Sequence, residues 1–317
     1  MDKIYLALTC IFFSVQFIFS KMYQKNSNGS INASLWMTIF YATASLILFG
    51  SQIGFTPDIP TTSIIYATIY TFAGILTTLS SILGMKLGKI STISTFMLLG
   101  GMVLPFFYGI IFLKESITTF KIIAIIIMIV ALIPSLINND KTKNKENNKK
   151  NHLLYNLVLI SVFIGNGAIS IITNAAKNIV ENPSTFPEKD YMFVVATTQI
   201  IIAVIVALII AIKNTVNKKE SFSKTLFTGI GKTYSLTAII IAAFFAAVYG
   251  IFNALGNLYS LKCVALEMDA SIQFPVISGS VIVLTAFIGW GLFKEKPQVK
   301  DWIAITLSVV GVILFNI

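Results

Sequence analysis

Residues 234–261 read YSLTAIIIAAFFAAVYGIFNALGNLYSL, an uninterrupted apolar run with no charge between Lys232 and Lys262. A helix of about 20 mostly apolar residues crosses the hydrocarbon core of a bilayer, so this run is typical of a transmembrane helix. Nine similar runs occur along the chain, and together they predict ten spans. The spans are expected at roughly 4–23, 34–54, 63–85, 90–113, 119–137, 153–178, 191–212, 234–261, 271–293 and 299–316.

The composition of the 317-residue chain is that of a membrane protein. The residues A, V, I, L, M, F, W, Y and C make up 56% of it, and the mean hydropathy is +0.84. Charged residues account for 11%, against about 25% in a soluble domain. All 13 acids fall in the connections or at span ends, whereas surface helices of a soluble protein carry charged faces. These features exclude a soluble enzyme, a secreted disulfide scaffold and a disordered protein.

The sequence offers no residues for metal or nucleotide chemistry. Two isolated cysteines, Cys10 and Cys263, and the single histidine His152 cannot supply the four ligands of a structural zinc site. No nucleophile–base pair or phosphate-binding glycine loop stands out. All 23 basic residues are lysine, so nucleic-acid binding is the weaker interpretation of the net charge of +10. We expect no enzyme activity, no cofactor, no metal and no nucleic-acid partner.

The lysines are distributed unequally between the two sides of the predicted membrane protein. Connections that follow odd-numbered spans carry 17 lysines, and the other side carries 6. Cytoplasmic loops are enriched in lysine, so this asymmetry predicts that both termini lie outside the cell.

The second half of the chain repeats the first. A gapless shift of 150 residues pairs Gln16 with Asn166 in the first span of each half. A shift of 180 residues pairs Ser80 with Ser260, Gly109 with Gly289, and Lys114-Glu115 with Lys294-Glu295. Five spans per half is an odd number, so the halves enter the membrane in opposite senses. The expected fold is an all-α membrane protein with ten transmembrane helices arranged as two inverted five-helix repeats.

A low-complexity stretch separates the two halves. The sequence NNDKTKNKENNKKN from Asn138 to Asn151 is polar, basic and rich in asparagine, and it is typical of a flexible linker. We therefore divide the chain into a first repeat at 1–138, a basic flexible linker at 139–151 and a second repeat at 152–317.

The first span also carries a family pattern. The residues FSVQFIFSK, from Phe13 to Lys21, resemble the pattern W-G-x-N-F-x-x-x-K of EamA-like members of the drug/metabolite transporter superfamily. The segments 109–133 and 289–313 resemble the way each repeat ends in that family, a short loop opening with Glu and then a Gly/Ala-rich last span. This sequence has Phe13, Ser14 and Gln16 where Trp, Gly and Asn are usual. The resemblance implies transport in the plasma (inner) membrane. Export is favoured because it is usual in the family, but the resemblance does not identify a substrate.

The clearest polar stripe lies in the run quoted first. Tyr249, Asn253 and Asn257 are spaced i, i+4, i+8 and share one helix face. An amide in hydrocarbon is costly unless it finds a partner. Such a stripe either lines a solute cavity or serves as hydrogen-bonding contact between helices. Two amides and a tyrosine on one face are more hydrogen-bonding groups than contact between helices requires, which favours the interpretation that the stripe lines a cavity.

Other spans supply polar residues that could face the same cavity. Interhelical hydrogen bonding is the structural alternative for each of them, and for Gln16 and Asn166 we weigh the two roles evenly. Trp36 and Gln199 could also face the cavity, with an interfacial position as the alternative for Trp36. The full predicted substrate-binding set is Gln16, Thr77, Ser81, Asn166, Tyr249, Asn253, Asn257 and Gln273.

Three charged residues are candidates for gating or coupling. Lys21 stands where the family pattern expects a basic residue, with snorkelling to the interface as its alternative. Glu115 and Glu295 occupy equivalent places in the two halves, and each could instead pair with a lysine and set the turn. The first span contains no acid, which disfavours a proton-coupled exporter of cations. Uncharged or zwitterionic polar solutes fit the Asn/Gln/Tyr/Thr lining better.

Three functional hypotheses follow from the sequence. The leading one is a secondary transporter of small polar metabolites that works by alternating access, as a monomer or homodimer in the lipid bilayer. The second is a flippase for a lipid-linked carrier, which predicts a lateral opening to lipid. The third is a membrane sensor or assembly subunit, which predicts that Asn253 and Asn257 are fully bonded to neighbouring helices with no cavity between the halves.

Overall fold

The fold was analysed in a computed structural model of the chain. It describes residues 2–28, 30–87, 90–136, 148–177, 186–218, 221–227, 229–231, 235–294 and 299–315. Within these ranges the chain is helical, with short turns and no strand. The helices are α1 (Asp2–Asn26), α2 (Ile31–Ile53), α3 (Thr61–Leu87), α4 (Ile90–Ile111), α5 (Thr119–Leu136), α6 (Asn148–Lys177), α7 (Glu188–Lys218), α8 (Phe222–Phe227), α9 (Leu236–Ala265), α10 (Ala270–Phe293) and α11 (Val299–Phe315).

Each apolar run predicted from the sequence overlaps one of these helices. By length and composition, α1, α2, α3, α6, α7, α9 and α10 are the seven helices of the described chain that could cross a membrane. The apolar stretches of α4, α5 and α11 within the described residues are shorter. The structure is therefore that of an all-helical, multi-pass membrane protein.

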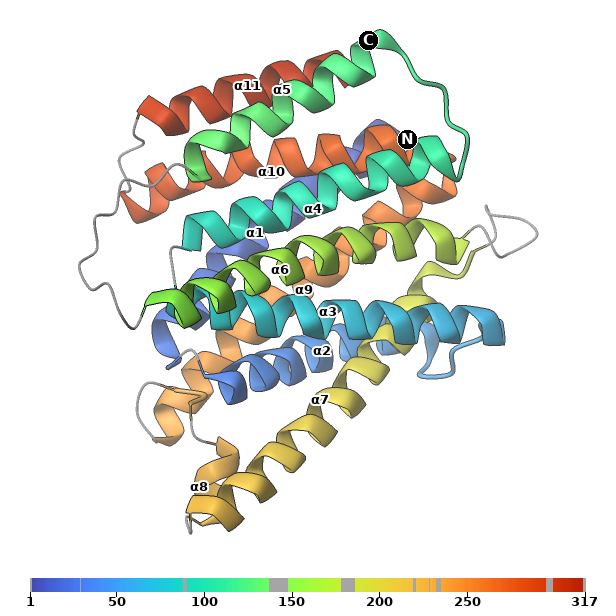
Figure 1. The fold of residues 1–317 in the computed structure, drawn as a ribbon. Helices are drawn as coiled ribbons and strands as arrows, with labels where there is room; N and C mark the ends of the chain where they lie inside the picture. Colours follow the sequence, from blue (N-terminus) through green and yellow to red (C-terminus); the bar gives the residue numbers. More distant parts are fainter. Residues whose placement is uncertain are drawn as a thin grey trace.

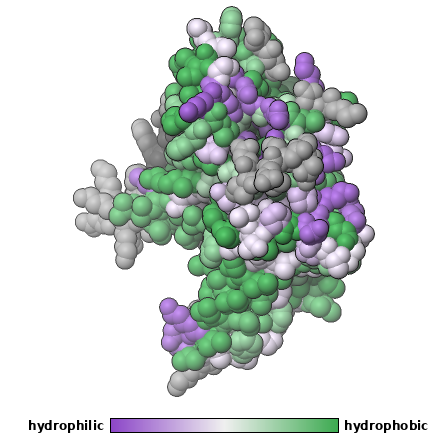
Figure 2. Space-filling model, turned by 90° about the vertical axis from the view of Figure 1, so that its right-hand side faces the viewer, coloured by the Kyte–Doolittle hydropathy of each residue, from purple (hydrophilic) through white to green (hydrophobic). Residues whose placement is uncertain are grey.

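The helices lie roughly alongside one another, and both termini lie at the same end of the bundle (Figure 1). Large apolar side chains are exposed along its flanks, for example Ile126 at 54% and Ile209 at 59%. Figure 2, which looks onto the end where the termini lie, shows polar side chains gathered there and apolar side chains along the flank below. An apolar flank with polar ends is what a bilayer requires of its protein surface.

Several helix ends are fixed by local hydrogen bonds that the sequence encodes. The hydroxyl of Ser30 accepts from the Ala33 N–H and caps α2, and Ser235 caps α9 through Ala238 in the same way. Lys114 and Lys294 both adopt the left-handed conformation, at φ 56° and 53°, just after α4 and α10. These two lysines are paired by the 180-residue shift, so residues paired in the two halves share the same left-handed backbone conformation.

Small residues let the helix backbones approach closely. Gly100 of α4 lies against the backbone of Phe163 in α6, and Gly250 of α9 lies against the backbone of Tyr41 in α2. The hydroxyl of Ser45 donates to the Gly250 carbonyl at 3.3 Å and adds a polar contact there. In lipid no hydrophobic effect drives helices together, so close van der Waals packing at small residues such as these stabilises the helix contacts instead.

The helices pack in a reciprocal arrangement. Helix α1 packs on α9 and α10, and α6 packs on α3 and α4. Helix α2 contacts α9, and α7 contacts α3. Three further contacts join α2 to α7, α4 to α10 and α5 to α11.

Two local features differ from the sequence-based expectation. Helix α6 begins at Asn148, so residues 148–151, predicted as linker within 139–151, are helical. The short helix α8 was not expected, because its six residues lie outside the apolar runs. It is held against α2 by Asn32, which donates to the Thr225 carbonyl, and by the indole of Trp36, which donates to the Leu226 carbonyl at 2.9 Å.

Candidate functional site

A cavity of about 820 Å³ lies inside the bundle. Its wall combines residues from α1, α2, α3, α4, α6, α7, α9, α10 and α11, so both halves of the chain contribute. The floor is formed by Tyr70, Thr173, Ser260 and Phe274. From there the lining follows α10 to Gly289 near its C-terminal end.

The two ends of the bundle differ in their relation to this cavity. We call the end near Lys21, Ile82, Ile93 and Ala304 the open end, because the cavity lining extends to these residues. The opposite end, where α4 connects to α5 and α9 to α10, lies beyond the floor, and we call it the closed end. Both chain termini lie at the closed end in Figure 1.

A chain of hydrogen bonds runs across the cavity wall and joins three helices. The hydroxyl of Tyr70 donates to Asn257 Oδ1 at 3.0 Å. The Asn257 amide donates to Asn253 Oδ1 at 3.2 Å, and the Asn253 amide donates to Gln16 Oε1 at 2.8 Å. The stripe predicted on the run 234–261 therefore lines the cavity and also bonds to α1 and α3. These amides fulfil both roles that the sequence left open.

Asn166 has a single well-defined partner. Its side-chain amide donates to the Met97 carbonyl of α4 at 2.7 Å while the residue lines the cavity. Its predicted repeat partner Gln16 is held by a side chain instead. Both residues lie on the cavity wall, Gln16 on α1 and Asn166 on α6.

Other lining groups keep polar atoms available to a solute. Gln199 of α7 is 6% exposed and has no hydrogen-bond partner among the described residues. The hydroxyls of Tyr249 and Ser81 likewise have none there. Thr77 also lines the cavity, but its hydroxyl donates to the Ala73 carbonyl of its own helix at 2.8 Å. An amide and two hydroxyls can therefore hydrogen-bond a polar solute directly.

Some predicted residues lie elsewhere. Gln273 is not among the described residues that line the cavity: it is fully buried and donates to the carbonyl and hydroxyl of Ser260. Trp36 is not on the wall, because its indole binds α8. Glu115 lies at the closed end, where it binds backbone N–H groups of α10 and no lysine among the described residues. Glu295 lies outside the described residues.

Sequence reasoning missed Tyr70, whose hydroxyl ends the hydrogen-bonded chain. The signal was present in the spacing, because Tyr70, Thr77 and Ser81 follow one face of α3 at i, i+7, i+11. Tyr70 was not singled out because tyrosine in an apolar run is also common at membrane interfaces.

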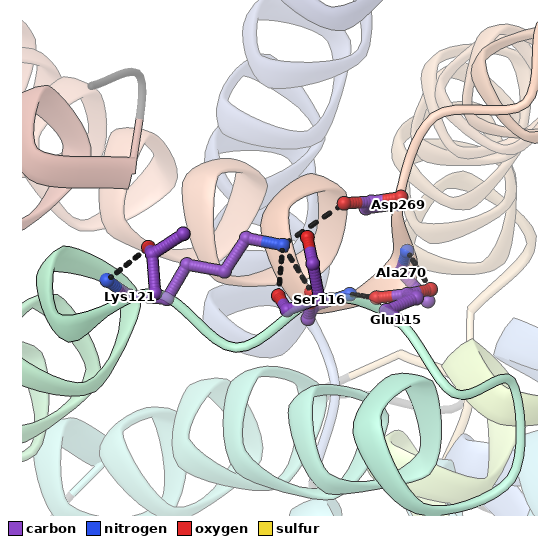
Figure 3. A network of polar contacts seen from close by, with 7 residues as sticks. Glu115, Ser116, Lys121, Asp269 and Ala270 are labelled. Atoms are coloured by element: carbon purple, nitrogen blue, oxygen red, sulfur yellow. Dashed lines mark hydrogen bonds and ion pairs between the residues drawn. The ribbon is translucent and has the colours of Figure 1, made fainter.

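The closed end is held by contacts to the start of α10. The Glu115 carboxylate accepts from the N–H groups of Ala270 at 2.7 Å and Ser271 at 2.9 Å (Figure 3). Lys121, a residue only 5% exposed, donates through its ammonium group to Asp269 Oδ2 at 2.9 Å and to the Ser116 carbonyl at 2.9 Å. We call these contacts between 115–121 and 269–271 the closed-end latch. A second lysine, Lys177 of α6, donates to the Val264 carbonyl nearby.

The comparisons with known proteins identify the fold. No protein family matches the sequence, and no curated protein does. Among solved structures 28 chains match. One of them, described only as a crystal structure of a protein, aligns over 99% of this chain and 95% of its own with a TM-score of 0.67 and 12% sequence identity. At 12% identity this similarity shows that the two chains share a fold, and it assigns no activity to either.

Proposed function

We propose that this chain is a secondary transporter of small polar metabolites, similar to EamA-like members of the drug/metabolite transporter superfamily. The observation that carries the proposal is a cavity of about 820 Å³ inside an apolar helical bundle, lined by residues of both halves that include several amides and hydroxyls. Polar groups inside a membrane domain are costly and mark solute pathways. A sensor or assembly subunit needs no such cavity.

The proposed architecture is ten transmembrane helices in two inverted five-helix repeats. In the two repeats α1 corresponds to α6, α2 to α7 and α3 to α9. The packing supports the architecture, because the contact of α1 with α9 has its counterpart in the contact of α6 with α3, and that of α2 with α9 in that of α7 with α3. Three further contacts each join a helix to its own counterpart in the other repeat: α2 to α7, α4 to α10 and α5 to α11. A pseudo-two-fold axis in the membrane plane would produce this pattern. The matching left-handed turns at Lys114 and Lys294 add independent support.

The proposed mechanism is alternating access, and the structure then represents one of its two states. The open end lies on the lysine-rich side, with Lys21, Lys25, Lys213 and Lys294 among the described residues there. By the positive-inside rule that side faces the cytoplasm, so the cavity faces inward and both termini lie outside. Export by a plasma membrane protein would begin from this state, with the solute entering from the cytoplasm.

Replacing two cavity amides tests both transport and site. In cells expressing Asn253→Ala/Asn257→Ala, efflux of the transported compound should fall about tenfold or more, because the removed hydrogen bonds are worth about 1 kcal/mol each. The measurement is comparative metabolite profiling of cells and medium against wild type and empty cells, at matched membrane levels. Gln52→Ala is the matched control, since that exposed amide bonds only within α2, to the Leu48 carbonyl.

The possible outcomes separate the hypotheses. Depletion inside and enrichment outside with wild type alone supports transport through this site, and enrichment inside reverses the direction. If the double variant and wild type have the same profile but differ from empty cells, transport stands and the site is elsewhere. If no strain differs from empty cells, the transporter proposal fails and the flippase and sensor hypotheses replace it.

A further inference from the structure

The described part of the cavity wall carries one formal charge, and it is positive. Of the described residues that line the cavity, Lys21 alone carries a formal charge, and no aspartate or glutamate lines it. The other polar lining groups are neutral amides and hydroxyls. A solute that brings a positive charge into this wall would therefore lose water without gaining a carboxylate partner.

Lys21 is placed where a bound solute would meet it. It lies on α1 near the open end, five residues after Gln16. At 1.5 Å per residue this separates the two along the helix by roughly 7.5 Å. A small solute could therefore place a charged group near Lys21 while its polar body reaches the amides of Gln16 and Asn253.

A second lysine lies beyond the floor. Lys177 is 3% exposed and lies one turn after Thr173, which forms part of the floor. Its ammonium donates to the Val264 carbonyl near the C-terminal end of α9. No described carboxylate lies within ion-pair distance of it, and Glu267 acts on it only through space. The dipole of a helix C-terminus stabilises a lysine held there, and this one lies one turn beyond the described cavity wall.

The described cavity wall therefore carries one ammonium group, that of Lys21, and no carboxylate, and the second lysine lies one turn beyond it. In a wall of low dielectric constant the interaction of such charges with a solute charge is much stronger than in water. Cavities lined by charges of one sign concentrate solutes of the other sign. The sequence alone favoured uncharged or zwitterionic solutes, and the positions of these lysines change that expectation.

We propose that the transported solute is a small organic anion, carrying one acidic group such as a carboxylate, and that Lys21 binds this group at the open end. The neutral amides and tyrosines then hydrogen-bond the rest of the molecule. This inference rests on the proposed transport function and narrows its substrate class.

The test uses the metabolite pool of expressing cells, sorted by net charge at pH 7. Wild type, Lys21→Gln and empty cells are compared by untargeted profiling of cells and medium. We expect the compounds moved by wild type to be anions, and their movement to fall about tenfold or more in Lys21→Gln. Lys25→Gln is the matched control, because this exposed lysine follows Lys21 on α1 but does not line the cavity.

Each result decides a different point. Movement of neutral or cationic compounds by wild type overturns the inference and leaves transport standing, whatever the variants do. Movement of anions that is unchanged in Lys21→Gln overturns the role of Lys21. The absence of any difference between wild type and empty cells defeats the transport proposal itself. Movement of anions by wild type and by Lys25→Gln, lost only in Lys21→Gln, supports the inference.

Discussion

Gly100→Ala is expected to lower the melting temperature of the detergent-purified protein by about 2–5 °C. A Cβ added at this position would overlap the Phe163 carbonyl oxygen and lie 2.7 Å from its carbon and 2.8 Å from the Phe163 Cα. These are backbone atoms, so no side-chain rotation can relieve the overlap, and α4 must move away from α6. Overpacking of this kind costs about 1–3 kcal/mol or more, which corresponds to several degrees.

Gly291→Ala is the matched control for this prediction. Gly291 lies in α10, is exposed, and has nothing within 4 Å of the position a Cβ would take. Alanine is the better helix former by about 1 kcal/mol, so this substitution should leave the melting temperature unchanged or raise it slightly. Equal melting temperatures for Gly100→Ala and Gly291→Ala would contradict the close contact between α4 and α6.

The same contrast extends to the contact between α2 and α9. At Gly250 an added Cβ would lie 2.6 Å from the Tyr41 Cα and 2.9 Å from its carbonyl carbon. Gly250→Ala should therefore also destabilise the protein. The two glycines lie at different interfaces, so a double variant should lose close to the sum of the two effects.

The features of the fold that a lipid bilayer requires could be predicted from the sequence. A bilayer demands long apolar runs and excludes acids from them. These two features located the seven helices that could cross a membrane and the helices α4, α5 and α11, whose described apolar stretches are shorter. The first residues of α6, from Asn148, were predicted as linker because they are polar. A helix can extend beyond the hydrocarbon region with polar residues, and their composition does not distinguish them from a linker. The close glycine contacts were invisible for a different reason, since a glycine in an apolar run does not reveal which helix faces it.

The candidate site was predictable where one helix carried several polar residues in register. The stripe of Tyr249, Asn253 and Asn257 repeats every four residues, and the structure places all three on the cavity wall. Single residues were ambiguous. Gln273 has the same amide chemistry, yet it binds Ser260 behind the wall, because its orientation depends on how α10 packs against α9. The partners of Glu115 lie about 155 residues away in sequence, so no local pattern could identify them.

The closed-end latch has the features of a gate for the proposed alternating access. The N-cap residue Asp269 makes no side-chain hydrogen bond to its own helix. The first two N–H groups of α10 are satisfied by Glu115, from the connection that follows α4. A carboxylate at a helix N-terminus is stabilised by hydrogen bonds and by the helix dipole. Opening the closed end would separate these groups, so their interaction energy favours the state described here.

Glu115→Gln is expected to open the closed end more often. The amide removes the negative charge and supplies only one carbonyl oxygen for the N–H groups of Ala270 and Ser271. Hydrogen bonds to charged groups contribute about 1.5–3 kcal/mol, so the population with an open end should rise roughly tenfold. The reporter is Thr173→Cys at the cavity floor, with Cys10 and Cys263 replaced by alanine. The measurement is its labelling rate by a membrane-impermeant maleimide added outside intact cells.

The expected result is slow labelling of Thr173→Cys in the Glu115 background and about tenfold faster labelling with Glu115→Gln. Lys121→Met should act in the same direction, because it removes the ion pair to Asp269. Asp58→Asn is the matched control, an exposed acid in the connection between α2 and α3. Labelling that stays slow in both latch variants would show that these contacts only stabilise the fold. Fast labelling already with Glu115 intact would place the open end outside the cell and reverse the orientation argued from the lysines.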